Sequence, residues 1–236
     1  MAGSEFEPEP GSFAAHLSAP TYAALRSSGD ERRYRSGATL VHQGDPSRHV
    51  VVLESGWVKV TATTRRGWEA VLAIRGAGDI LGELSALDAR PRLGTVTTLT
   101  PVTAVLIADE RFKACLRADW SLAEALLRHL TANLRESDER RIQFGGSNGD
   151  SRLFAILHEL CERHGRPTDE GVLIGLPLSQ QDLAAAVGVS REVVARSMRL
   201  LRSRAIVITR RRQIVVRQPD LLRSLAASVS LSTDPP

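Results

Sequence analysis

The chain has 236 residues, of which 42% are hydrophobic, so it can bury the core of one large domain or two modest domains. No apolar run approaches the length of a membrane span and no signal-peptide pattern opens the sequence, which argues against a membrane protein and predicts a cytoplasmic one. The two cysteines, Cys115 and Cys161, are too few for a disulfide framework and fit a reducing compartment.

The first half of the chain is expected to be a β domain. Residues 1–11 are acidic and proline-rich and are predicted to form a disordered tail. After a loose helical pattern over residues 13–25, short apolar or alternating stretches follow one another from Arg32 to about Ile107. Short strands at near-regular spacing are typical of a small antiparallel barrel or jelly roll, which we place at residues 12–120.

One loop interrupts this pattern. Gly78 to Ser85 reads GDILGELS, and Asp88 to Arg92 reads DARPR. A glycine-flanked loop that leads into a short helical turn, with two arginines after it, is unusual inside a sheet. Loops of this kind carry function more often than packing, so we expect a site here.

A long helix is predicted over residues 121–144, after a short one at residues 109–117. Six positions on it are spaced alternately by three and four residues, which is the pattern of a coiled-coil seam. They are Leu127, Leu130, Leu134, Ser137, Arg141 and Phe144. We expect this helix to pair with its own copy in a homodimer. Packing of the seam on the chain's own barrel is the alternative.

A glycine-rich segment then breaks the chain. Residues 145–149 read GGSNG and are interpreted as a hinge between domains. We expect residues 150–222 to form a C-terminal domain, with Asp150 capping a helix over residues 151–164 and a strand after it. Residues 223–236 are interpreted as a C-terminal tail.

The positive charge lies in this C-terminal part. Between Ser190 and Arg223 there are ten arginines and two acidic residues, a net charge of +8. Because the whole chain carries +4, the remainder is net acidic at −4. Such a local excess predicts a polyanionic partner for the C-terminal part alone, and the motif described next makes double-stranded DNA the expected one.

Residues 178–203 have the pattern of a helix-turn-helix. Ser179 opens a short helix, Gly188 supplies the turn, and Ser190 caps a second helix on which Val194, Met198 and Leu201 form an apolar stripe. An arginine that can fork onto guanine and a glutamate that can accept from cytosine suit reading of the major groove. The residues expected at the DNA are Ser179, Gln180, Ser190, Arg191, Glu192, Arg196 and Arg199.

A hairpin follows the second helix. Two strands, at residues 206–208 and 213–216, are joined by a turn that contains Arg210, Arg211 and Arg212. A hairpin with an arginine tip placed directly after a recognition helix is typical of a wing. Its guanidinium groups are expected to reach phosphates rather than bases.

Together these features resemble the CRP/FNR family of bacterial transcription regulators, over about residues 30–222. The resemblance implies an α+β fold with an N-terminal cyclic-nucleotide-binding-type β jelly roll, a long dimerisation helix and a C-terminal winged helix-turn-helix. Its motif S-R-E-x-V-x-R is matched by Ser190, Arg191, Glu192, Val194 and Arg196, which implies a palindromic operator with TGTGA-like half-sites. RNA polymerase is a further implied partner.

The implied ligand site departs from the family pattern. Gly82, Glu83, Leu84 and Arg92 match the phosphate loop of cyclic-AMP binders, but Leu93 stands where those proteins have Ser. On the long helix, Ser137 fits one hydroxyl position that meets the base, whereas Asp138 replaces the next. The sequence therefore leaves cyclic-AMP binding open and keeps another cyclic nucleotide or small anion as a candidate ligand.

Other classes of function fit less well. An iron–sulfur cluster needs more cysteines, and no haem ligand pair is found. His158 and Cys161 lie three residues apart on one helix, but two ligands do not make a metal site or a catalytic centre. We therefore expect no metal and no enzyme. The remaining alternative is a cyclic-nucleotide-binding signalling or adaptor protein with only non-specific affinity for DNA.

Overall fold

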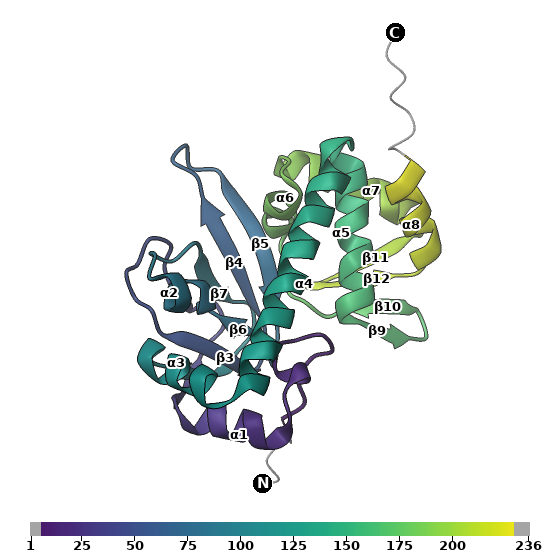
Figure 1. Cartoon of the computed structure of the whole chain (residues 1–236). Helices are drawn as coiled ribbons and strands as arrows, with labels where there is room; N and C mark the ends of the chain where they lie inside the picture. Colours follow the sequence, from purple (N-terminus) through teal and green to yellow (C-terminus); the bar gives the residue numbers. More distant parts are fainter. Residues whose placement is uncertain (1–5, 229–236) are drawn as a thin grey trace. The chain divides into compact units, whose positions relative to one another are not determined.

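The computed structural model describes residues 6–228, and the chain folds as two compact units (Figure 1). The boundary lies between Arg135 and Glu136, inside the long helix α4 (Trp120–Gly145). It therefore precedes the glycine segment at residues 145–149, whose role as a hinge stays a prediction. Helix α4 starts one residue before the predicted range and ends one residue after it.

The first unit contains two four-stranded antiparallel sheets, which confirms the predicted β domain. One sheet has the strand order β1-β8-β3-β6 and the other β2-β7-β4-β5. The strands are β1 (Asp30–Tyr34), β2 (Thr39–Val41), β3 (Val50–Ser55), β4 (Val58–Thr63), β5 (Glu69–Arg75), β6 (Ile80–Leu81), β7 (Thr95–Thr98) and β8 (Val102–Ile107).

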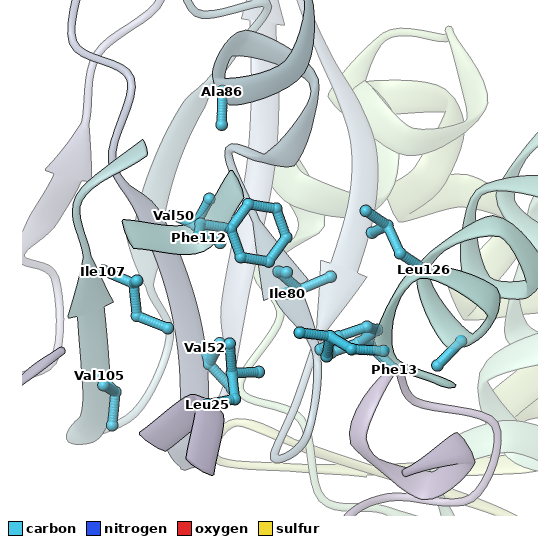
Figure 2. Close-up of a cluster of buried hydrophobic side chains, with 12 residues drawn as sticks. Phe13, Leu25, Val50, Val52, Ile80, Ala86, Val105, Ile107, Phe112 and Leu126 are labelled. Atoms are coloured by element: carbon cyan, nitrogen blue, oxygen red, sulfur yellow. The ribbon is translucent and has the colours of Figure 1, made fainter. Parts of the chain in front are cut away.

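Strand β3 is buried on both faces, which explains why its residues do not alternate between apolar and polar. Val50 and Val52 pack into one cluster, together with Phe112 and other residues from the helices (Figure 2). Val51 and Leu53, which point the opposite way, pack into a second cluster with residues of both sheets. Because both faces of β3 are covered, the run Val50 to Leu53 is apolar throughout.

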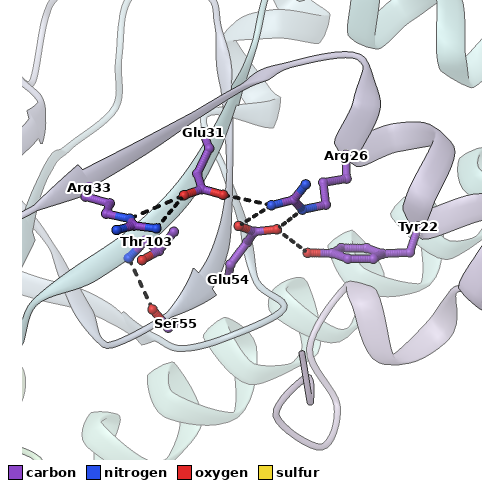
Figure 3. Close-up of polar contacts among 7 residues, drawn as sticks. All are labelled: Tyr22, Arg26, Glu31, Arg33, Glu54, Ser55 and Thr103. Carbon is purple, nitrogen blue, oxygen red and sulfur yellow. Dashed lines mark hydrogen bonds and ion pairs between the residues drawn. The ribbon is translucent and has the colours of Figure 1, made fainter. Parts of the chain in front are cut away.

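Four helical segments accompany the sheets. They are a short 3-10 turn (Ala14–His16), α1 (Ala19–Ser27), α2 (Glu83–Asp88) and α3 (Asp109–Ala118). An ionic network attaches α1 to the sheet: Arg26 pairs with Glu54 of β3 and, at 2.8 Å, with Glu31 of β1 (Figure 3). The Tyr22 hydroxyl also contacts Glu54, and burial raises the pKa of this phenol.

The predicted N-terminal disorder is wrong for residues 6–11. The ring of Phe6 stacks on Tyr22 with 4.3 Å between the centroids, and the Glu9 N–H donates to the Ala77 carbonyl at 2.8 Å. The ring contact with α1 and the backbone hydrogen bond to Ala77 together attach this charged, proline-rich segment to the first unit. Residues 1–5 of the predicted tail lie outside the described residues.

The second unit contains the end of α4, the helix-turn-helix and a small antiparallel sheet, as predicted. The sheet has the order β11-β12-β10-β9, so the wing is the edge of a four-stranded sheet. The elements are α5 (Gly149–His164), β9 (Gly165–Thr168), β10 (Gly171–Ile174), α6 (Gln180–Val187), α7 (Arg191–Ser203), β11 (Val207–Arg210), β12 (Gln213–Val216) and α8 (Pro219–Ser228).

Two predictions at the ends of this unit are corrected. Helix α8 occupies residues 219–228, so the predicted tail at 223–236 is helical as far as residue 228, and residues 229–236 lie outside the described residues. Asn148, not Asp150, caps α5, because its side chain accepts a hydrogen bond from the Ser151 N–H at 3.0 Å. Asp150 lies inside the first turn, where its carboxylate is available for other contacts.

Candidate DNA interface and ligand site

Helix α6 begins with a reciprocal cap. The Ser179 hydroxyl accepts from the Asp182 N–H at 3.1 Å, and the Asp182 carboxylate accepts from the Ser179 N–H at 2.9 Å. Caps of this kind stabilise a helix by about 1 kcal/mol. Gly188 then adopts a φ of +69°, a left-handed conformation that favours glycine and turns the chain towards α7. Ser179 is exposed and Gln180 is half-buried, next to each other at the start of α6.

Helix α7 presents a charged face and buries the opposite one. Val194, Met198 and Leu201 are buried, as the predicted stripe requires, and Ser197 is buried with them. The predicted contact residues Arg191, Glu192, Arg196 and Arg199 are all exposed. The exposed Ser190 hydroxyl accepts from the Val193 N–H at 3.4 Å and so caps the start of α7.

The surroundings of Glu192 favour the ionised form of its side chain, which only accepts hydrogen bonds. The pKa of its carboxyl group is lowered, first by a hydrogen bond with the Ser190 side chain and next by the backbone N–H of Glu192 itself. The neighbouring Arg191 lowers this pKa further. An ionised glutamate has acceptors only, which matches the exposed amino group of cytosine in the major groove.

The turn between β11 and β12 carries the three predicted phosphate contacts. Arg210 is opposite Gln213, and Arg211 and Arg212 form the tip. All three arginines are exposed. Arg210 also makes an ion pair of 2.6 Å with Glu170, from the turn between β9 and β10, so its charge is partly neutralised in the free chain.

The structure adds a residue that the sequence did not single out as a contact. The carboxylate of Asp150 on α5 lies 3.6 Å from Arg196 Nη2 and accepts a hydrogen bond from the Ser197 hydroxyl. Ser197 lies 47 positions from Asp150 in the sequence, so no local pattern could have predicted these contacts.

In the first unit, Arg92 is held by the protein's own oxygen atoms. Its side chain donates to the carbonyls of His49 at 2.6 Å and Gly82 at 3.1 Å, and to the Ser47 hydroxyl at 3.2 Å. Arg92 is only 4% exposed. Burial lowers the pKa of its guanidinium group, an effect that Glu83 opposes.

The remaining residues of the loop divide into buried and exposed ones. Glu83 is buried, and desolvation raises the pKa of its carboxyl group. Leu84 and Leu93 are exposed, Leu93 to 65%. The loop thus brings Gly82 and Arg92 into contact, with the charge of Glu83 near Arg92, and their part in binding an anion stays a prediction. Ser137 and Asp138 belong to the second unit, and their part in a ligand site stays a prediction.

The predicted seam on α4 does not have one uniform environment. Leu127 and Leu134 are 54% and 64% exposed, whereas Leu130 packs partly against the first unit's own core. Ser137 is exposed, and Arg141 is exposed and pairs with Asp138 at 3.5 Å. The Arg152 guanidinium lies over the Phe144 ring, with 5.6 Å from Arg152 Cζ to the ring centroid. Packing on the chain's own core, the alternative at the sequence level, therefore applies to Leu130.

Two structural findings concern metal binding and membrane insertion. Over residues 6–228, no three His, Cys, Asp or Glu side chains lie together in a way that could hold a metal ion. None of the helices in that range has the length and apolar character needed to cross a membrane.

Comparison with known proteins agrees with these two units. Residues 31–119 match the cyclic nucleotide-binding domain, and residues 151–225 match the Crp-like helix-turn-helix domain. A CRP-like cAMP-activated global transcriptional regulator of Mycobacterium tuberculosis is 30% identical over 162 residues, which are 69% of this chain and 72% of that protein. The cyclic AMP receptor protein of Thermus thermophilus is 28% identical over 92% of this chain and 97% of its own length.

A solved structure shows the same fold. The c-di-GMP responsive global regulator CLP of Xanthomonas campestris superposes with a TM-score of 0.74 at 23% identity, covering 84% of this chain and 99% of its own. The β domain, the winged helix-turn-helix and these matches define a DNA-binding transcription regulator, not an enzyme. The chain belongs to the CRP/FNR family of transcription regulators.

Proposed function

We propose that the chain acts as a homodimer that reads a two-fold symmetric operator with TGTGA-like half-sites. The observation that carries this proposal is the face of α7 on which Arg191, Glu192 and Arg196 are all exposed, while the opposite face is buried. These three residue types at the start of a recognition helix match the hydrogen-bonding groups of guanine and cytosine. Arg210, Arg211 and Arg212 would hold the phosphates beside the half-site.

The exposed leucines of α4 support the dimer. Leu127 and Leu134 place two large apolar side chains in solvent one heptad apart, and pairing with a second copy would bury them. Two recognition helices in such a dimer would enter successive major grooves, about 34 Å apart. The proposed site of action is the cytoplasm, with RNA polymerase as the partner that responds to the bound dimer.

We propose further that the β domain binds a small anionic ligand and that its preference has moved away from cyclic AMP. Leu93 offers no hydroxyl beside Arg92, and losing a hydrogen bond to a charged phosphate costs about 1.5–3 kcal/mol. The relatives themselves differ in effector: one is described as cAMP-activated and another as c-di-GMP responsive. Cyclic-AMP binding is therefore weak or absent, and DNA binding does not strictly require it.

A ligand would control DNA binding only through its different affinity for two arrangements of the dimer. Helix α4 spans the boundary between the units, so a change in its pairing would reach both recognition helices. Within the second unit, Glu136 and Arg140 of α4 pair with Arg163 and Glu159 of α5 at 2.8 Å and 2.9 Å. These pairs attach the end of α4 to the DNA-binding unit.

Selection from a random duplex library tests the proposed function. We expect the wild-type protein to enrich one palindromic sequence, and Arg191→Ala to lose about 1–3 kcal/mol of affinity and its preference at one base pair. Arg211→Ala should weaken binding to all duplexes and lower the salt slope by about one. Arg166→Ala, on the edge strand opposite the wing, is the charge-matched control. If no sequence is enriched, the chain is instead an adaptor with non-specific DNA affinity.

A further inference from the structure

The carboxylate of Asp150 connects the start of α5 to the middle of the recognition helix. One oxygen, Oδ1, accepts a hydrogen bond from Ser197 Oγ and also lies 3.6 Å from Arg196 Nη2. Asp150 thus contacts two consecutive residues of α7, one buried and one exposed.

The two contacts have different consequences. Ser197 is 1% exposed, and its hydroxyl oxygen is also 2.8 Å from the Val193 carbonyl, so the carboxylate is attached to a part of α7 that cannot move freely. The Arg196 side chain is 65% exposed. A guanidinium group has five N–H donors in a rigid plane, so a carboxylate at one edge leaves the others available. Asp150 therefore lies at ion-pair distance from one edge of the Arg196 guanidinium and leaves most of the donors of that group available.

We propose that Asp150 is a specificity-determining residue that acts by positioning Arg196. This inference rests on the proposed role of Arg196 in reading a base. A fixed arginine loses less side-chain entropy when it forms a bidentate contact with guanine. The Asp150 charge also disfavours the approach of phosphates, which penalises DNA on which Arg196 finds no matching base.

The two effects change specific and non-specific binding in opposite directions. Replacing Asp150 by Asn removes a negative charge near the DNA, which should tighten binding to unrelated duplexes by roughly five-fold. The same replacement releases Arg196, which should weaken its preference for one base. We expect the ratio of operator affinity to non-specific affinity to fall by about ten-fold or more.

The experiment uses the full chain and the duplex that the wild-type protein enriches from a random library. Dissociation constants are measured for this duplex and for a scrambled one, with wild type, Asp150→Asn and Ser197→Ala. Ser197→Ala keeps the charge but frees the carboxylate, so it should relax the base preference without tightening non-specific binding. Glu162→Gln removes the same charge from the same helix, where the carboxylate contacts His158 and Arg223, and should change neither quantity.

A double-mutant cycle separates positioning from a purely structural role. If Asp150 acts through Arg196, Asp150→Asn should have no effect on base preference in an Arg196→Ala background. Equal losses on both duplexes, with a lower melting temperature and an unchanged base preference, would overturn the proposal. If the wild-type protein enriches no sequence, the proposed function itself fails; if it does and Asp150→Asn keeps the full ratio, only the role of Asp150 fails.

Discussion

Arg92 Nη2 donates a hydrogen bond of 2.6 Å to the carbonyl oxygen of His49. Nη1 donates to the Gly82 carbonyl and Nε to the Ser47 hydroxyl, so an anion that binds at this loop must share the arginine with oxygen atoms of the protein. A Cβ atom on Gly82 would stand 2.1 Å from Arg92 Nη1, so only glycine allows this approach. The loop is built around the arginine, and in the proposed ligand site the hydroxyl groups beside Arg92 would determine how strongly a phosphate binds.

The first prediction concerns the hydroxyl groups beside Arg92. Leu93→Ser places a donor next to Arg92, and we expect it to tighten cyclic-AMP binding by about ten-fold or more in titration calorimetry. Arg92→Ala should abolish binding of any anion at the loop. Arg90→Ala is the control, because its side chain is 84% exposed and lies near Asp88 instead.

Two results would contradict this view of the ligand site. Submicromolar cyclic-AMP binding by the wild-type protein would show that Leu93 does not weaken the site. No gain from Leu93→Ser, combined with no anion binding at all, would show that the loop has lost its binding function.

The second prediction concerns the dimer. Leu127→Glu together with Leu134→Glu should give monomers in analytical ultracentrifugation and lower operator affinity, because both side chains are more than half exposed in the single chain. Leu130 is avoided, since it packs on the chain's own core and its replacement would also destabilise the first unit.

The matched control for the dimer is Trp120→Glu. This side chain is 72% exposed at the start of α4 and lies outside the seam, so the variant should remain dimeric. A wild-type protein that sediments as a monomer at micromolar concentration would refute the dimer.

The parts of the fold that depend on nearby residues could be predicted. The helix-turn-helix depends on caps and a glycine turn within a few positions of each other, such as Ser179 with Asp182 and Gly188. Strand β1 reads DERRY and strand β9 reads GRPT. Neither shows the apolar alternation that identifies a strand, because only pairing with β8 and β10 defines them.

The contacts that adjust the candidate site could not be predicted. Arg92 with His49, Ser197 with Asp150 and Arg210 with Glu170 are separated by 43, 47 and 40 residues. Each joins groups whose proximity follows from packing alone. The prediction of the seam failed for a different reason at Leu130. A heptad pattern on α4 does not reveal which of its residues face the chain's own core.

The third prediction uses the pH dependence of Glu83. This side chain is 8% exposed, and burial raises the pKa of its carboxyl group above the usual range, although its own N–H, Arg75 and Arg92 act in the opposite direction. A group with a higher pKa in the folded state stabilises the fold below the unfolded pKa of about 4.3, and this stability is lost as the pH rises through the folded value. Above the folded pKa of Glu83, its buried carboxylate therefore destabilises the first unit.

Glu83→Gln should consequently raise the free energy of unfolding at a pH above the folded pKa of Glu83, measured as a higher melting temperature, and the difference from wild type should vanish below about pH 4. His49, whose pKa is lowered by burial and by Arg92, destabilises both proteins as the pH falls, so it does not create this difference. Glu110→Gln, at a side chain that is 79% exposed on α3, should show no such pH-dependent gain. A Glu83→Gln variant that is less stable than wild type at neutral pH would show that the ion pairing with Arg75 and Arg92 outweighs the cost of burying the carboxylate.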